Sequence, residues 1–347
     1  MKNKKLKILA LVAIVVVVAG IGAYVYTSQQ DTESTTKETR TITDMAGRTV
    51  EIPATVERIV SVNPMATQAV FVAHGQDKLV GITLKMGRKK MEEIYPKIKN
   101  MPAPMGPEGI NIEEILSLKP DVVLSKAGTR WTGSNKKMEE AGIPLVCIYP
   151  ESPELLIESV QLIGDVLGKE KEAEDFVSFY DKKMEYIRSN TQIPEDEKMK
   201  VYVAGPDKLT TAGRDWYQSY LIEDAGGINV AGSIMGGWKT VSIEQILRWN
   251  PDVIVVVSYC SDSVDDILSN PRWQQINAVK NRRVHRIPRY IEAWDMPVPE
   301  SILGTMWLSN KLYPEEVHFN MAEEMKTFYS KFYNYTITEE EIAQILR

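Results

Sequence analysis

Arginine and aromatic residues recur together in the polar segments of this sequence. Arg130 precedes Trp131, and Arg214 lies close before Trp216 and Tyr217. A guanidinium group forms charge-assisted hydrogen bonds with an anion, and an aromatic ring can stack on a flat ligand. These pairs are therefore candidates for binding an anion or a planar metal chelate. For any one pair, a surface arginine or a tryptophan with only a packing role is an equally valid interpretation.

Further candidates lie where predicted strands end. Because the carboxyl ends of parallel strands border the ligand crevice of an open sheet, we expect binding residues in the loops that follow the strands. Arg214 and Trp216 stand out, because they follow a short turn at 210–213 whose backbone N–H groups could assist anion capture at a helix start. The expected ligand-binding residues are Asn63, Met65, Arg88, Arg130, Trp131, Arg214, Trp216, Tyr217, Trp238 and Trp294.

The residue types present disfavour a bare metal ion and catalysis. The sequence holds only three histidines, His74, His285 and His318, which fall in separate predicted elements, whereas a zinc or manganese site needs several converging ligands. It also lacks the motifs of nucleophile elbows, phosphate loops, dinucleotide folds and Cys-x-x-Cys sites. We therefore expect no catalytic residue, no metal ligand and no cofactor. Cys147 and Cys260 fall in different predicted lobes, so we expect two free thiols.

One stretch of the sequence occurs twice, at 111–124 and at 242–255. Aligned on Glu113 and Glu244, the two copies share Ile, Glu, Ile, Leu, Pro, Asp and Val at matching places. Each copy indicates a capped helix, a proline that ends it, and a β-branched strand without polar alternation, which is typical of parallel strands covered on both faces. The repeat therefore predicts two α/β lobes built alike.

The predicted fold class is α/β, with two Rossmann-like lobes, each a mainly parallel sheet flanked by helices, joined by one long rigid helix. The stretch 152–190 supports the connecting helix, because it has no proline after Pro153 and its apolar residues recur at helical spacing. The expected boundaries are an N-terminal lobe at 41–165 that opens with a β-hairpin, a connecting helix at 166–192, a C-terminal lobe at 199–313, and a helical tail at 314–347 whose aromatic residues pack on the body.

The N-terminal residues 1–40 indicate the compartment. Four lysines precede an uncharged run at 8–26, which is long enough to span a hydrocarbon core of ~30 Å. Because lysines stay on the cytoplasmic side, the rest of the chain is expected outside. We expect a membrane anchor at 8–26 followed by a polar tether, or a signal segment that is cleaved. A net charge of −6 gives no general attraction to nucleic acid.

The ordered motifs of this sequence resemble the substrate-binding proteins of ABC importers. They are Thr-Asp-Met-Ala-Gly-Arg at 43–48, Glu-Arg-Ile-Val at 57–60, the paired Ile-Glu-x-Ile-Leu segments, and the segment 271–284. The sequence is similar to the helix-linked, class III branch, whose members carry iron–siderophore complexes, cobalamin, haem and in some cases molybdate or tungstate. The resemblance implies a ligand held between two lobes by a monomer, little closure on binding, and a membrane permease with its ATPase as partners.

The same resemblance implies a role for the repeated glutamates. Glu113 and Glu244 are expected to meet arginines of the permease, since a carboxylate early in a helix is favoured there and faces solvent. The alternative is ordinary helix-start charge without a partner. For the ligand, an iron(III)–siderophore is the first hypothesis, and molybdate or tungstate, cobalamin and haem stay open. An enzyme and a purely structural surface protein are the other classes considered.

Overall fold

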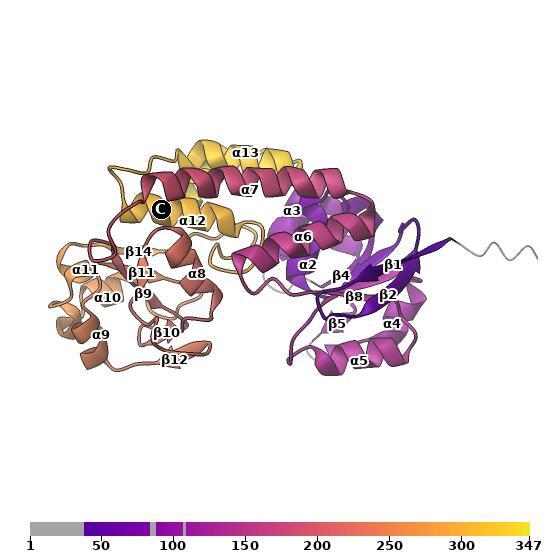
Figure 1. Cartoon of the computed structure of the whole chain (residues 1–347), viewed down its shortest axis with the longest axis horizontal. Helices are drawn as coiled ribbons and strands as arrows, with labels where there is room; N and C mark the ends of the chain where they lie inside the picture. Colours follow the sequence, from indigo (N-terminus) through magenta and orange to yellow (C-terminus); the bar gives the residue numbers. More distant parts are fainter. Residues whose placement is uncertain (1–37, 84–87, 107–108) are drawn as a thin grey trace, which may run out of the picture. The chain divides into compact units, whose positions relative to one another are not determined.

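The computed structural model describes residues 38–83, 88–106 and 109–347 (Figure 1). Residues 39–347 form one compact unit. The expected anchor at 8–26 and most of the tether lie outside the described residues. Within the described ranges, no helix combines the length and the apolar character that crossing a membrane requires.

The first lobe is built on four parallel strands in the order β4, β3, β7, β8. These strands are almost wholly buried, as expected when helices cover both faces of a sheet. An antiparallel hairpin, β1 (Thr39–Thr43) with β2 (Thr49–Pro53), precedes the sheet and confirms the predicted hairpin. The strands are β3 (Ile59–Ser61), β4 (Leu79–Ile82), β7 (Val122–Lys126) and β8 (Leu145–Ile148); the intervening helices are α2 (Pro64–Val72), α3 (Arg88–Ile94), α4 (Ile112–Ser117) and α5 (Thr132–Glu140).

The second lobe repeats this plan with four parallel strands in the order β11, β9, β13, β14. A separate antiparallel pair, β10 (Thr210–Ala212) with β12 (Trp238–Thr240), lies beside it. The predicted fold of two mainly parallel α/β lobes is confirmed. The strands are β9 (Lys200–Ala204), β11 (Ile228–Asn229), β13 (Val253–Val256) and β14 (Val284–Arg286); the helices are α8 (Tyr217–Asp224), α9 (Ile243–Trp249), α10 (Val264–Leu268), α11 (Asn277–Lys280) and α12 (Ser301–Leu312).

The two copies of the sequence repeat adopt the same local structure. Asn111 Oδ1 accepts a hydrogen bond from an N–H of α4, and Ser242 Oγ does so at the start of α9, which confirms both caps. Lys119 with φ 47° and Asn250 with φ 43° turn the chain out of these helices before the prolines are reached. The strands that follow, β7 and β13, each lie in the middle of their sheet.

The helical stretch between the lobes is two helices rather than one. Helix α6 (Pro153–Leu167) ends at Gly168, which adopts φ 64°, and α7 (Glu170–Asn190) begins two residues later. Glycine has no Cβ that opposes this left-handed conformation, so the chain turns there at little cost. The connecting helix expected at 166–192 is therefore shorter at both ends. Helix α7 is the part of the main chain that leads from the first lobe to the second.

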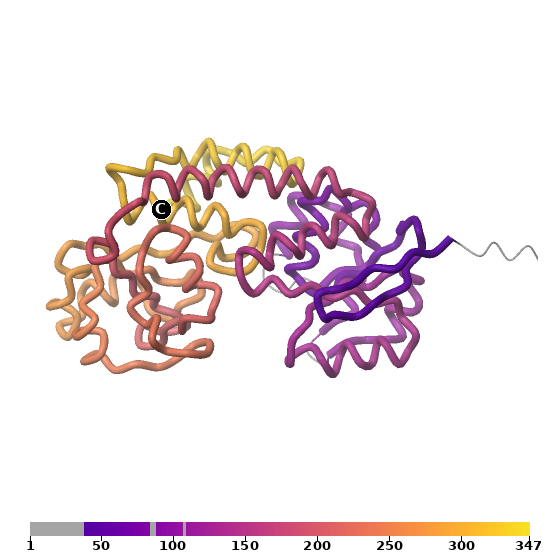
Figure 2. Tube along the Cα trace, viewed as in Figure 1, coloured from indigo at the N-terminus to yellow at the C-terminus, as the bar shows by residue number. Residues whose placement is uncertain are grey.

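The C-terminal tail packs on the rest of the protein, as predicted from its aromatic residues. Its helices are α13 (Met321–Tyr333) and α14 (Glu339–Ile345). The rings of Phe328 and Phe332 lie 6.1 and 5.4 Å from the ring of Phe179 on α7. Figures 1 and 2 show α13 running beside α7. Both cysteines, Cys147 and Cys260, are buried free thiols, as expected.

Candidate functional site

Three aromatic rings form a continuous ladder in the second lobe. Trp216 directly precedes α8, Trp238 begins β12 and Tyr259 follows β13. The ring of Trp238 lies 6.5 Å from that of Trp216 and 6.4 Å from that of Tyr259, in edge-to-face contacts. Trp216 is 36% exposed, whereas the other two rings are half-buried. The aromatic ladder therefore leads from the surface toward the interior at the end of a central strand.

Two glycines make room for this arrangement. A Cβ at Gly205, directly after β9, would lie 2.4 Å from the ring of Trp238. A Cβ at Gly213 would lie 2.1 Å from the carbonyl oxygen of Gly236. Only glycine fits at such approaches. The close contact at Gly213 fixes the loop that carries Arg214. The side chain of Arg214 is exposed and has no ion pair among the described residues.

A buried polar cluster lies behind the ladder. The hydroxyl of Tyr259 donates to Asp295 Oδ2 over 3.0 Å, and Gln218 Nε2 donates to the same oxygen over 2.8 Å. Asp295 is fully buried. Burial raises the pKa of this carboxyl, and the two hydrogen bonds oppose that rise only in part. One end of the aromatic ladder, Tyr259, is thus held by a hydrogen bond to a buried acidic side chain.

The corresponding loop of the first lobe carries Arg130 and Trp131. It follows β7 and leads into α5, and Asn135 of that helix holds it in place. Asn135 Oδ1 accepts a hydrogen bond from Ser125 Oγ over 2.7 Å, and its Nδ2 donates to the carbonyl oxygen of Lys126 over 3.0 Å. Arg130 is exposed, Trp131 is half-buried, and within the described ranges Arg130 has no acidic partner. In each lobe, a loop thus carries an exposed arginine close to a tryptophan, and neither arginine has an ion pair among the described residues.

Three other expected binding residues are occupied by contacts within the first lobe. Asn63 is buried and caps α2, where its Oδ1 accepts from the N–H of Met65 over 2.9 Å. Met65 is half-buried against the core. Arg88 Nε donates to Glu92 Oε1 over 2.9 Å, and its Nη2 donates to the carbonyl oxygen of Ile98 over 3.2 Å. These contacts hold the three side chains within the lobe, and Arg88 already has Glu92 as an ionic partner.

Two further candidates of the second lobe are buried in its core. Tyr217 is 4% exposed, and its hydroxyl lies 2.7 Å from Ser301 Oγ. Trp294 is fully buried against Gly304 of α12, where a Cβ would lie 3.0 Å from that of the tryptophan. A ligand in a surface cleft does not reach such side chains. We therefore leave Tyr217 and Trp294 out of the candidate site.

Sequence reasoning missed Gln218 and Tyr259. The repeat carried a usable signal, because it places Tyr259 after β13 at the point where Gly128 follows β7. Gln218 had no signal in the sequence, since it lies inside a helix and its partner Asp295 is far along the chain. The candidate site therefore has two parts: Arg130 and Trp131 on a loop of the first lobe, and Trp216, Trp238 and Tyr259 with the nearby Arg214 in the second lobe, where Gln218 and Asp295 lie behind Tyr259.

The repeated glutamates lie on exposed first turns of matching helices. Glu113 on α4 has no ion pair among the described residues. Glu244 on α9 accepts a hydrogen bond from Arg272 Nη2 over 3.1 Å. Its pKa is lowered, chiefly by its own backbone N–H and the Ser242 hydroxyl, with a further contribution from Arg272. Both carboxylates are accessible to a partner protein, and they differ in their neighbours.

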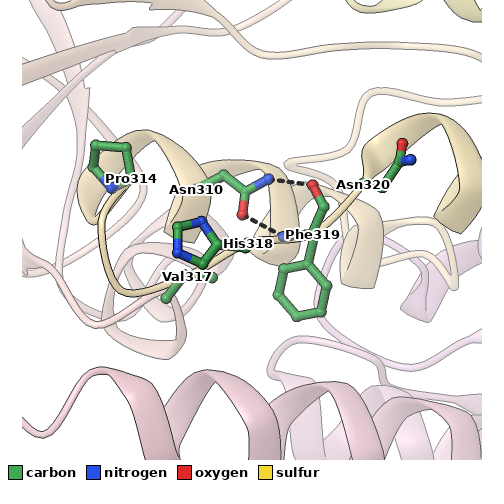
Figure 3. Close-up of a pocket in the computed structure, with 6 residues that line it drawn as sticks. All are labelled: Asn310, Pro314, Val317, His318, Phe319 and Asn320. Carbon is green, nitrogen blue, oxygen red and sulfur yellow. Dashed lines mark hydrogen bonds between the residues drawn. The ribbon is translucent and has the colours of Figure 1, made fainter.

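A separate surface hollow of about 410 Å³ lies at the start of the tail (Figure 3). Asn310 lines this hollow, but its Nδ2 donates to the carbonyl oxygen of Phe319 over 2.8 Å and its Oδ1 accepts from the N–H of the same residue over 2.9 Å. These bonds hold the segment before the tail helices in place and occupy both polar atoms of the Asn310 side chain. Within the described ranges, no three His, Cys, Asp or Glu side chains come together as metal ligands would.

The sequence is similar to a family of binding proteins and to individual relatives whose ligands are known. A family model described as "Periplasmic binding protein" matches residues 59–291. The molybdate-binding protein MolA of Haemophilus influenzae is 31% identical over 324 residues, covering 85% of this chain and 91% of MolA. The vitamin B12-binding protein of Vibrio vulnificus is 22% identical, covering 72% of this chain and 88% of that protein.

Solved structures show the same fold. A periplasmic solute-binding protein from Veillonella parvula superposes with a TM-score of 0.77 and 30% identity, covering 89% of this chain and 97% of that one. The structure of H. influenzae MolA bound to molybdate gives a TM-score of 0.74 and 29% identity, covering 86% of this chain and 99% of that one.

Proposed function

We propose a ligand from the family of this protein, since the chain belongs to the class III periplasmic binding proteins of ABC importers. The proposed ligand is a small tetrahedral oxyanion of the molybdate and tungstate class. The protein is a substrate-binding component of such an importer and resembles transport proteins rather than enzymes. The observation that carries the ligand assignment is the similarity to MolA, which extends over most of both chains.

The charges of the candidate site support an anion. Arg130 and Arg214 are exposed on loops that follow β7 and β10, and neither has an ion pair within the described part of the chain. A guanidinium group donates two parallel hydrogen bonds to an oxyanion, and each such bond is stronger than one between neutral groups. We infer that these two arginines, one from each lobe, bind oxygens of the ligand, with Trp216 and Trp238 forming an apolar wall.

The protein acts outside the cytoplasm in this proposal. The uncharged run at 8–26 holds it at the outer face of the membrane, or is removed as a signal. Glu113 and Glu244 then dock the two lobes on the permease. The sequence-based hypothesis of an iron(III)–siderophore stays a prediction, and it is the alternative outcome of the ligand test.

The test is calorimetric titration of the purified protein with a panel of ligands. Molybdate and tungstate should bind with submillimolar or tighter affinity, and sulfate, which is smaller, provides a control for general anion binding. A ferric siderophore and cyanocobalamin complete the panel. Tight binding of either large ligand, with no heat from molybdate or tungstate, would refute the oxyanion assignment.

A further inference from the structure

Two buried oxygens behind the aromatic ladder have no hydrogen-bond partner in the part of the chain that the structure describes. They are Asp295 Oδ1 and Gln218 Oε1. Asp295 is fully buried and Gln218 is 3% exposed. An acceptor that is buried without a partner costs free energy, and an ionised carboxylate buried without a cation costs far more. The hydrogen-bonded pair of Asp295 and Gln218 contains two such oxygens, one on each side chain.

The groups around Asp295 supply hydrogen bonds but no positive charge. From α8, Gln218 Nε2 donates to Asp295 Oδ2 over 2.8 Å and to the carbonyl oxygen of Asp295 over 3.1 Å. From the segment after β13, the hydroxyl of Tyr259 donates over 3.0 Å. No lysine, arginine or histidine among the described residues contacts this carboxyl. An ionised Asp295 would therefore be a buried charge held by neutral donors alone.

The orientation of the Gln218 amide follows from the same contacts. Exchanging its nitrogen and oxygen would place Oε1 3.1 Å from the main-chain carbonyl oxygen of Asp295, which can only accept a hydrogen bond. The amide nitrogen must therefore be the atom that faces Asp295. The amide oxygen, Oε1, then has no partner among the described residues. A carboxylic acid and a primary amide can form a ring of two hydrogen bonds, in which each group donates once and accepts once.

We propose that Asp295 is a neutral carboxylic acid that pairs with the amide of Gln218 and keeps negative charge away from an anion bound at the aromatic ladder. Its Oδ1–H donates to Gln218 Oε1, while Gln218 Nε2 donates to Oδ2, so both orphaned oxygens gain a partner. The raised pKa of this carboxyl, caused first by burial, agrees with the arrangement. The role in ligand binding rests on the proposed oxyanion function, whereas the protonation state does not.

The pairing explains how an acidic residue is tolerated in a site for an anion. An ionised carboxylate behind Tyr259 would repel a dianion, and the repulsion is strong because little water separates the two groups. The hydroxyl of Tyr259 does not lose its own proton in the neutral range, because burial raises its pKa. Asp295 is therefore the group in this cluster whose proton can be lost, and its ionisation should weaken anion binding. It acts through Tyr259 and is a positioning residue.

Infrared difference spectroscopy of the full chain tests the protonation state without any ligand. The spectrum of the native protein minus that of Asp295→Asn at neutral pH should contain the C=O band of a protonated carboxylic acid. In Gln218→Met, which removes the amide partner, this band should move to higher frequency because the acid loses its acceptor. If Asp295→Asn does not fold, the shift in Gln218→Met carries the test. Carboxylate bands in place of the acid band would overturn the proposal.

Molybdate affinity across the pH interval in which the acid band disappears tests the link to the ligand. In the native protein the Kd should rise by about tenfold or more through this interval, because a dianion then meets a negative charge. In Asp295→Asn the Kd should stay nearly constant over the same pH interval. An acid band together with a flat native Kd would overturn the ligand link. Absence of molybdate binding at every pH would instead reject the oxyanion function and leave the protonation result standing.

Discussion

The hydroxyl of Tyr333 donates a hydrogen bond to Gln68 Oε1 over 2.9 Å, and both side chains are buried. Tyr333 ends helix α13 of the tail, and Gln68 lies on α2 of the first lobe. The tail also reaches the second lobe, because the hydroxyl of Tyr329 donates to the buried carboxyl of Glu300 over 2.5 Å. The tail is thus a second connection between the lobes beside α7.

Substitution Tyr333→Phe should lower the free energy of unfolding by about 1 to 3 kcal/mol, because it leaves a buried acceptor of Gln68 without its donor. Urea denaturation measures this. Tyr149→Phe is the matched control, since Tyr149 is 37% exposed and its loss of a hydroxyl should cost little. Equal stability of the two variants would show that the bond to Gln68 does not hold the tail.

Glu300 should make the protein less stable as the pH rises through neutrality. Burial raises its pKa from 4.5 to about 7, so the folded protein binds this proton more tightly than the unfolded chain does. The stabilisation is complete below the unfolded pKa and is lost as the pH rises through about 7. At ~1.4 kcal/mol per pKa unit, the contribution is at most about 3.5 kcal/mol.

Denaturation at pH 5 and pH 8 measures that loss. Glu300→Gln should reduce the difference between the two free energies of unfolding, whereas Glu316→Gln, at an exposed position of the tail, should not. Asp224, whose pKa burial also raises to about 7, contributes in the same direction and remains in both variants. A pH dependence that is identical in Glu300→Gln and the native protein would contradict the assignment.

The three arginines expected to bind the ligand should behave differently from one another. Arg130→Ala and Arg214→Ala should each weaken molybdate binding by about tenfold to a hundredfold, because a charge-assisted hydrogen bond contributes roughly 1.5 to 3 kcal/mol. Arg88→Ala should chiefly lower stability, since its guanidinium bonds Glu92 and the carbonyl oxygen of Ile98.

Titration of the three variants at low and high salt checks this prediction. Ionic screening should weaken binding in the native protein and have less effect once Arg130 or Arg214 is removed. Affinity that is insensitive to both substitutions and to salt would argue for a neutral ligand held by Trp216 and Trp238.

Charge reversal at the repeated glutamates should affect transport and not ligand binding. Glu113→Lys and Glu244→Lys should both impair uptake while molybdate affinity stays unchanged, because both carboxylates lie on exposed helix starts. Glu113 should matter more, since Glu244 already has Arg272 as a neighbour 3.1 Å away. Arg272→Ala should then bring the contribution of Glu244 closer to that of Glu113.

Uptake by vesicles that carry the permease is the measurement, with Glu158→Lys as a control on the exposed face of α6. Loss of ligand affinity in purified Glu113→Lys would place this residue in the binding site. Uptake that is equal in the control and in both glutamate variants would remove the docking role.

The sequence was sufficient to predict the sheets because local signals and the repeat agreed. The strand at Lys200–Ala204 and the hairpin opening the first lobe both have unbroken β-branched or alternating patterns. The break at Gly168 was missed because helical periodicity continues on both sides of it. Burial of Tyr217 and the pairing of Gln218 with Asp295 depend on packing between distant segments, and no local pattern encodes such contacts.

Locating molybdenum in crystals of the protein grown with molybdate tests the central claim most directly. The anomalous signal of the metal marks its position independently of the surrounding protein. The account predicts one strong peak beside the ring of Trp238. The oxygens around that peak should lie within hydrogen-bond distance of the side chains of Arg130 and Arg214. A peak only in the hollow beside Asn310, or no ordered molybdenum at saturating molybdate, would contradict it.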